Sequence, residues 1–305
     1  MTGNTNTGKK TEYLADIFII RFELLISNLE KFITEGDAEV LHQSRVSARK
    51  MEALFDTFGH LSFSGDYKKI SSEIKGLIRL LGSGRESDVC MQFTDDYLAV
   101  IKIHDTRIMG FKRHLRRLER LRNNRDEING AVEKIIRDKE NIKEFFNEVF
   151  RHENRMFSPE NLRGYLKYSM PRLFDEIMNY KEEVMKGSKR KLHKMRIKSK
   201  PLRYMLETSV EFLNLKVEKF HKSVKAFVEK AGTVHDYDVL IEILMDYRKE
   251  FSKNNYKGML LGSGNSLKIF SSYLSRMRKS EFEYLKELLE GYNEEYRKTF
   301  IDSLM

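Results

Sequence analysis

Cysteine and proline are scarce in this chain of 305 residues, which has one cysteine, Cys90, and three prolines. A single cysteine excludes an internal disulfide and a metal site built from several cysteines, and it fits a reducing compartment. We expect Cys90 to be a core residue. Few prolines and a composition with 33% charged and 40% hydrophobic residues favour long amphipathic helices over strands.

The chain also lacks a long uninterrupted apolar run. Its first ten residues are polar, and Asp16, Arg21 and Glu23 interrupt the apolar segment that follows. This pattern excludes a secretory signal and a bilayer span in that segment. We therefore expect a soluble, cytoplasmic protein without a membrane partner.

Positive charge is in excess. Lys and Arg number 56 against 46 acidic residues, so the formal net charge is +10. Such an excess favours a polyanionic partner, but it does not choose among nucleic acid, a phosphate polymer and a membrane surface.

Apolar residues recur at helical spacing almost everywhere, and no segment has a convincing strand pattern, so the sequence predicts an all-α fold. Gly36 is expected to end the first helix, with Asp37 as the N-cap of the second. A further break is expected at Gly232. The predicted helices cover about 13–33, 38–58, 66–81, 85–103, 106–123, 131–150, 159–185, 189–206, 217–230 and a segment from 235 onward, with Ser158 as the cap of the helix that begins at Pro159.

Two of these helices carry a His followed by a row of cations on one face. At 100° per residue, Arg196, Lys200 and Arg203 lie within about 80° of His193. His42, Arg45 and Arg49 repeat the pattern in an earlier segment. Apolar residues lie on the opposite face of both helices: Met51, Leu54, Phe55 and Phe58 in the first, and Met195, Leu202, Met205 and Leu206 in the second.

The two segments indicate an internal duplication. His193 follows His42 by 151 residues, and the pair Asp238-Val239 follows Asp88-Val89 by 150. Because landmarks more than forty residues apart keep the same offset, duplication explains the pattern better than coincidence. The predicted halves are 10–152 and 158–302, with six helical segments each.

These residues resemble the CHAD domain, the conserved histidine α-helical domain. The first half matches its signature with His42, Arg45, Val46, Arg49 and Lys50, and the second with His193, Arg196, Ile197, Lys200, Leu202, Arg203 and Tyr204. The copies also depart from it. Pro201 stands where Lys50 stands in the first copy, and Glu52 stands where Arg203 stands in the second, so each half lacks one cation. Pro201 is expected to kink its helix.

The resemblance implies two antiparallel four-helix bundles related by a pseudo-twofold axis, together forming one CHAD domain, with a basic central channel that binds inorganic polyphosphate. Arginine forks and lysine ammonium groups suit phosphate oxygens, and a linear phosphate chain needs no aromatic stacking. A second basic row, between residues 113 and 120, has no counterpart at the same offset. The predicted binding residues are His42, Arg45, Arg49, Lys50, His193, Arg196, Lys200, Arg203, Arg113, Arg116, Arg117 and Arg120.

Asp88 and Asp238 lie in segments that resemble an RDxDV-like element of the same family, although both copies are incomplete. They could orient basic side chains of the signature helices. A helix N-terminus also favours an acid on electrostatic grounds alone, and the residues leave both interpretations open.

Other functions find less support in the residues. Gly82-Ser83-Gly84 and Gly262-Ser263-Gly264 lack the Gly-Lys-Ser/Thr of a phosphate-binding loop, and no triphosphate-processing domain is recognisable. The histidines do not cluster at zinc spacing, so no metal and no cofactor are expected. We expect a non-catalytic polyphosphate binder, for which polyphosphate granules are a candidate location. The alternatives are a helical nucleic-acid-binding protein and, with less support, a phosphohydrolase or kinase acting on polyphosphate.

Overall fold

A computed structural model describes residues 14–58, 65–82, 85–102, 105–122, 125–152, 159–254 and 265–304. Within these ranges the fold is all-α and contains no strand. The helices are α1 Leu14–Glu35, α2 Ala38–Phe58, α3 Gly65–Gly82, α4 Arg85–Ile101, α5 Thr106–Arg122, α6 Arg125–Arg137, α7 Lys139–Asn147, the π-helix η2 Glu148–His152, α8 Pro159–Met178, α9 Lys181–Met185, α10 Lys189–Phe212, α11 Glu218–Asn254, α12 Asn265–Glu290 and α13 Glu294–Leu304.

The helix ends follow local sequence signals. Gly36 has a φ of 65°, which glycine adopts without steric cost, and it separates α1 from α2. The side chain of Asp37 accepts a hydrogen bond from the backbone N–H of Val40 at 2.8 Å, as expected of an N-cap. Pro159 is the first residue of α8, as predicted, whereas its predicted cap Ser158 lies outside the described residues.

The two predicted amphipathic faces are confirmed. Met51 and Leu206 are fully buried, and the other six apolar residues predicted to lie opposite the cations are no more than 8% exposed. Cys90 is buried as well. Burial of the apolar stripes fixes the direction in which the basic faces of α2 and α10 point.

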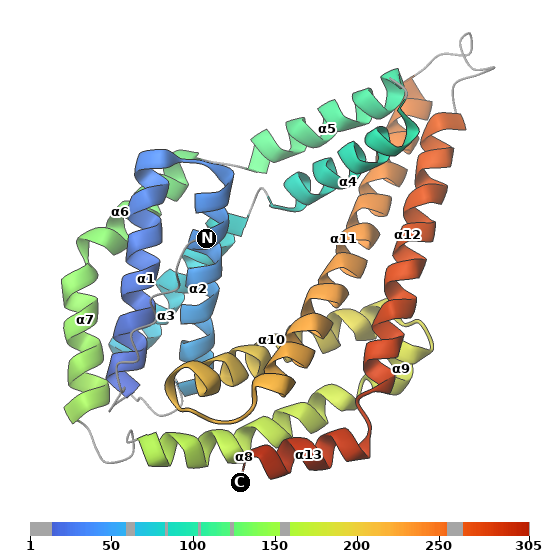
Figure 1. Cartoon of the computed structure of the whole chain (residues 1–305). Coiled ribbons are helices and arrows are strands. Elements are labelled where there is room, and N and C mark those ends of the chain that lie inside the picture. Colours follow the sequence, from blue (N-terminus) through green and yellow to red (C-terminus); the bar gives the residue numbers. More distant parts are fainter. Residues whose placement is uncertain are drawn as a thin grey trace.

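Two hydrophobic cores hold the helices together. The larger core takes side chains from α1, α2, α3, α6, α7, α8 and α10, and from parts of α11, α12 and α13. In the smaller core, Phe111 of α5 packs with Tyr97 of α4, Leu240 of α11 and Phe270 of α12. Figure 1 shows α4 and α5 beside α11 and α12, away from α1 to α3. Both cores therefore combine residues from the two predicted halves, and neither core belongs to one half alone.

Three expectations about helix breaks are wrong. One is the single helix expected over 159–185, which is divided into α8 Pro159–Met178 and α9 Lys181–Met185. The predicted break at Gly232 is absent, because α11 continues from Glu218 to Asn254. A glycine inside a helix costs only about 1 kcal/mol relative to alanine, and packing at both ends of α11 outweighs that cost. Conversely, the single helix expected over 131–150 is divided at Asp138 into α6 and α7, with η2 after α7.

Candidate anion-binding site

The basic faces of α2 and α10 meet at a pocket of about 400 Å³, the central pocket. Helices α2 and α10 pack against each other, and α11 closes the pocket from the side of α10. It is lined by His42, Arg45, Val46, Arg49, Lys50, Arg196, Lys200, Arg203, Tyr204, Val228, Glu229, Gly232, Thr233 and Asp236. Six of these residues are Lys or Arg and two are acids, so cations from both signature segments face one space.

Some of the cations already have carboxylate partners. Arg49 donates to Glu52 at 2.8 Å on its own helix, and Arg203 lies 3.5 Å from Glu229 of α11. The Nε of Arg203 is buried and has no hydrogen-bond partner among the described residues. A donor in that position favours an acceptor from a bound anion, since a buried unpaired N–H is costly.

Lys50 of α2 forms an ion pair with Glu207 of α10 at the wall of the central pocket. Glu207 is 7% exposed. Glu207 also lies 3.6 Å from Arg21 of α1, and Arg21 donates to Glu211 at 2.6 Å. Burial of Glu207 opposes its ionisation, but the adjacent Lys50 ammonium and the charge of Arg21 hold its pKa below the usual range. This network joins α1, α2 and α10 beneath the basic face.

A second pocket, of about 610 Å³, adjoins the central pocket at α2, and we call it the first flank pocket. Its lining includes His42 and Arg45, which also line the central pocket, together with Lys112 and Arg116 of α5. The remaining lining residues are Leu41, Asp88, Val89, Met91, Gln92 and Asp95. The two pockets therefore adjoin across one turn of α2.

His193 does not line the central pocket. It lies in a third pocket of about 330 Å³, the second flank pocket, with Lys189, Arg190, Lys194, His235, Asp238, Val239 and Glu242. The rings of His193 and His235 are 5.2 Å apart between centroids. Burial lowers the pKa of His235, and the charges of Arg196 and His193 add to that effect. The structure thus brings His42, but not His193, together with the cations of the central pocket.

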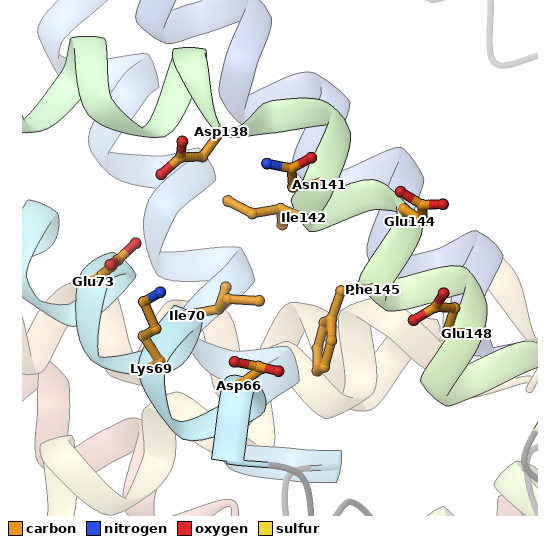
Figure 2. A pocket seen from close by; sticks show the side chains of 10 residues that line it. All are labelled: Asp66, Lys69, Ile70, Glu73, Asp138, Asn141, Ile142, Glu144, Phe145 and Glu148. Atoms are coloured by element: carbon orange, nitrogen blue, oxygen red, sulfur yellow. The ribbon is translucent and has the colours of Figure 1, made fainter.

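Another pocket has the opposite charge. Figure 2 shows a pocket of about 430 Å³ between α3 and the α7–η2 segment. Its rim has one cation, Lys69, against five carboxylates: Asp66, Glu73, Asp138, Glu144 and Glu148. Such a rim repels a polyanion, so the basic pockets at α2 are the ones that suit an anionic ligand.

No helix among the described residues is both long enough and apolar enough to cross a membrane. The same ranges contain no group of three or more His, Cys, Asp or Glu side chains that could hold a metal ion.

A family model described as the CHAD domain matches residues 18–245. The chain belongs to the CHAD domain family. Among solved structures, it is similar to the CHAD domain from the plant Ricinus communis, with 16% identity, a TM-score of 0.65, and coverage of 93% of this chain and 94% of that one. PptA from Streptomyces chartreusis is also similar, with 11% identity, a TM-score of 0.61, and coverage of 92% and 99%. At these identities the two likenesses establish the fold. The search among proteins of curated function found no match.

The two aspartates of the CHAD segments have different surroundings. Asp238 is 9% exposed, accepts from Arg278 of α12 at 3.0 and 3.1 Å, and forms an ion pair with Lys189 at 2.6 Å. Asp238 thus holds a cation of α10, although not one of the signature residues. Asp88 is exposed, and desolvation raises the pKa of its carboxyl although the charge of Arg45 lowers it.

Only one member of the predicted basic row on α5 lines a pocket described above. Arg116 faces the first flank pocket, whereas Arg113, Arg117 and Arg120 are exposed and absent from the linings of the central and flank pockets, so these three are not included in the binding site proposed below. Desolvation and the charge of Asp88 raise the pKa of the nearby Glu119 carboxyl. The charges of Arg120 and Arg116 lower this pKa, but the net shift is upward.

The analysis of the sequence missed several residues at the site, namely Glu207, Glu229, Asp236 and Arg278. Glu207 had a usable signal, because it follows His193 by fourteen residues and therefore lies within about 40° of it on the helix. Asp236 stands within the His235-to-Val239 segment already singled out. Glu229 and Arg278 had no local signal, since only the packing of α11 and α12 brings them to the site.

Proposed function

We infer that this CHAD protein binds inorganic polyphosphate in the central pocket and does not convert it chemically. The observation that carries this proposal is the meeting of Arg45, Arg49 and Lys50 with Arg196, Lys200 and Arg203 around one space. Guanidinium groups match phosphate oxygens with two parallel donors, and lysines add point charges. The resemblance of the signature segments to the family supports the same ligand. We also propose that the protein acts in the cytoplasm and associates there with polyphosphate granules.

A linear phosphate chain suits the pocket better than a nucleic acid does. The lining contains no Phe or Trp and one Tyr, Tyr204, and its other ring is the imidazole of His42, so there is no row of large aromatic side chains on which successive bases could stack. The space of about 400 Å³ lies between helices and suits a thin chain more than a duplex. Nucleic acid remains the competing ligand to be tested.

The proposal is tested by competition at fixed ionic strength. Long-chain polyphosphate is expected to displace single-stranded and duplex nucleic acid from the protein. Tighter binding of either nucleic acid would replace polyphosphate as the ligand. Release of inorganic phosphate that depends on a divalent cation would show instead that the protein is an enzyme.

A double variant, Arg45→Ala with Arg196→Ala, tests the location of the site. Each charge-assisted contact contributes about 1.5 to 3 kcal/mol, less where water screens it, so affinity should fall by about tenfold or more. The matched control is Arg79→Ala with Arg117→Ala, which removes the same charge from exposed positions outside the pockets described here. Equal loss in both double variants, with helicity unchanged by circular dichroism, would refute the pocket as the site.

A further inference from the structure

The central pocket has different relations to the two flank pockets. It shares the lining residues His42 and Arg45 with the first flank pocket, and it shares none with the second. A polyphosphate chain that contacts Arg45 can therefore continue into the first flank pocket along cationic side chains. The central pocket and the second flank pocket, which contains His193, have no lining residue in common.

Arg116 is the cation that extends this path. Lys112, the other cation that α5 contributes to the first flank pocket, forms an ion pair with Asp95 of α4. Arg116 is exposed on the pocket wall, and its charge acts on the nearby Glu119 carboxyl. An anion in this pocket therefore gains most from Arg116 and Arg45.

Carboxylates in the first flank pocket limit the gain. Asp88 lines the pocket, and the pKa values of Asp88 and Glu119 are both raised, chiefly by desolvation. A bound polyanion raises them further, because like charge disfavours ionisation. Removing the charge of Asp88 should therefore strengthen binding of any chain that enters this pocket.

Several cations on the other side of the central pocket are engaged within the protein. The Arg196 guanidinium lies against Gly232, with its nitrogens 3.5 and 3.6 Å from the position that a Cβ would occupy. Lys189 and Arg278 both bind Asp238. Each flank pocket is lined by two carboxylates, Asp88 and Asp95 in the first and Asp238 and Glu242 in the second, so the two pockets do not differ in their number of acids.

We propose that a long polyphosphate chain runs from the central pocket past His42 and Arg45 into the first flank pocket, where Arg116 is an additional binding residue. This proposal rests on polyphosphate being the ligand of the central pocket. It makes binding depend on chain length, since a short chain is held within the central pocket and a long chain also contacts α5. The path is one-sided, and the second flank pocket with His193 and His235 is not part of it.

The test compares Arg116→Gln with Arg117→Gln, its neighbour on the same helix, which loses the same charge but lines neither pocket. Isothermal calorimetry is run with tripolyphosphate and with long-chain polyphosphate at several salt concentrations. Arg116→Gln should weaken the long chain about twofold to fivefold and reduce its salt dependence. Affinity for tripolyphosphate should be unchanged, and Arg117→Gln and Arg190→Gln should bind both probes like the wild type.

The affinity of Asp88→Asn for long-chain polyphosphate is an independent test of the same path. It should tighten binding of the long chain, because a negative charge is removed from the wall of the first flank pocket. Weaker binding of the long chain by Asp88→Asn, or equal behaviour of Arg116→Gln and Arg117→Gln, would refute the path while leaving polyphosphate as the ligand. A wild-type protein that binds neither probe would refute the proposed function itself, and the path with it.

Discussion

The two signature segments share the pattern of a His followed by an Arg three residues later, but the structure gives these residues different surroundings. Arg45 of α2 lines two adjoining pockets, whereas its counterpart Arg196 of α10 lies against Gly232 of α11 and lines only the central one. His42 faces the central pocket, and His193 lies outside it. Position in the sequence pattern therefore does not by itself give a side chain its role.

The difference is associated with a difference in helix continuity. In the first segment α3 ends at Gly82 and α4 begins at Arg85, while α11 covers the corresponding stretch of the second as one helix. Gly232 follows Gly82 by 150 residues. No described atom lies within 4 Å of the position of a Cβ at Gly82, in contrast to Gly232 with Arg196. A continuous helix gives Arg196 a surface on which to pack, and the interrupted one leaves Arg45 between two pockets.

The largest expected effect is a difference in the free energy of unfolding between variants of two acids at matching positions. Glu207 is buried and binds Lys50 of the other segment, whereas Asp56, 151 residues earlier, is exposed and binds Lys75 at 2.7 Å. Glu207→Ala should lower the free energy of unfolding by about 3 kcal/mol, because it removes the buried carboxylate that Lys50 and Arg21 share and leaves Arg21 with Glu211 alone. Asp56→Ala should cost no more than about 1 kcal/mol. Urea unfolding measures the stability of both variants. Similar losses of stability would show that the contact between Glu207 and Lys50 stabilises the protein no more than an exposed ion pair does.

The second comparison concerns the aspartates. Asp238→Asn removes the charge from a nearly buried contact with Arg278 and Lys189, and it should destabilise the protein by about 1.5 to 3 kcal/mol. Asp88→Asn should stabilise it at neutral pH. Because the pKa of Asp88 is raised in the folded state, the unfolded protein loses this proton first, and stability falls as the pH rises through the window above 3.8. Thermal unfolding of both variants at pH 7 decides this, and a loss of stability in Asp88→Asn would contradict it.

A smaller effect is expected at Gly232. Alanine here would make an ordinary contact with Arg196 and would favour the helical state of α11, so Gly232→Ala should raise stability by about 0.5 to 1 kcal/mol. Affinity for polyphosphate should change little. A destabilised variant would mean that Arg196 cannot adjust, and that the close approach to Gly232 is required.

The smallest effect is a pH dependence at His235. Burial and nearby cations lower its pKa in the folded state, so the unfolded chain takes up this proton more readily. Stability should therefore fall as the pH drops from 6.5 toward the lowered pKa, and it should recover above that window. His235→Gln should flatten this part of the curve of unfolding free energy against pH. An unchanged slope would show that His235 is not the titrating group.

Much of the fold follows from the sequence alone. The apolar stripes of α2 and α10 are buried as predicted, and the cap at Asp37 and the turn at Gly36 are where local rules place them. These features depend on residues within a few turns of each other, so periodicity and capping preferences are enough to find them. The spacing of His, Arg and Lys along each helix also identified the two segments that carry the basic faces.

Tertiary packing decided the rest. Whether a helix breaks at a glycine depends on a local cost of about 1 kcal/mol, which long-range contacts easily exceed, and this is why Gly232 was misjudged. The packing of α2 against α10 brings Glu207 to Lys50, and the packing of α10 against α11 places Arg196 on Gly232. Arg45 lines two pockets because α10 and α11 lie on one side of it and α4 and α5 on the other. The sequence determined which helix faces are basic, and the packing of helices distant in the chain decided which of their cations face a common space.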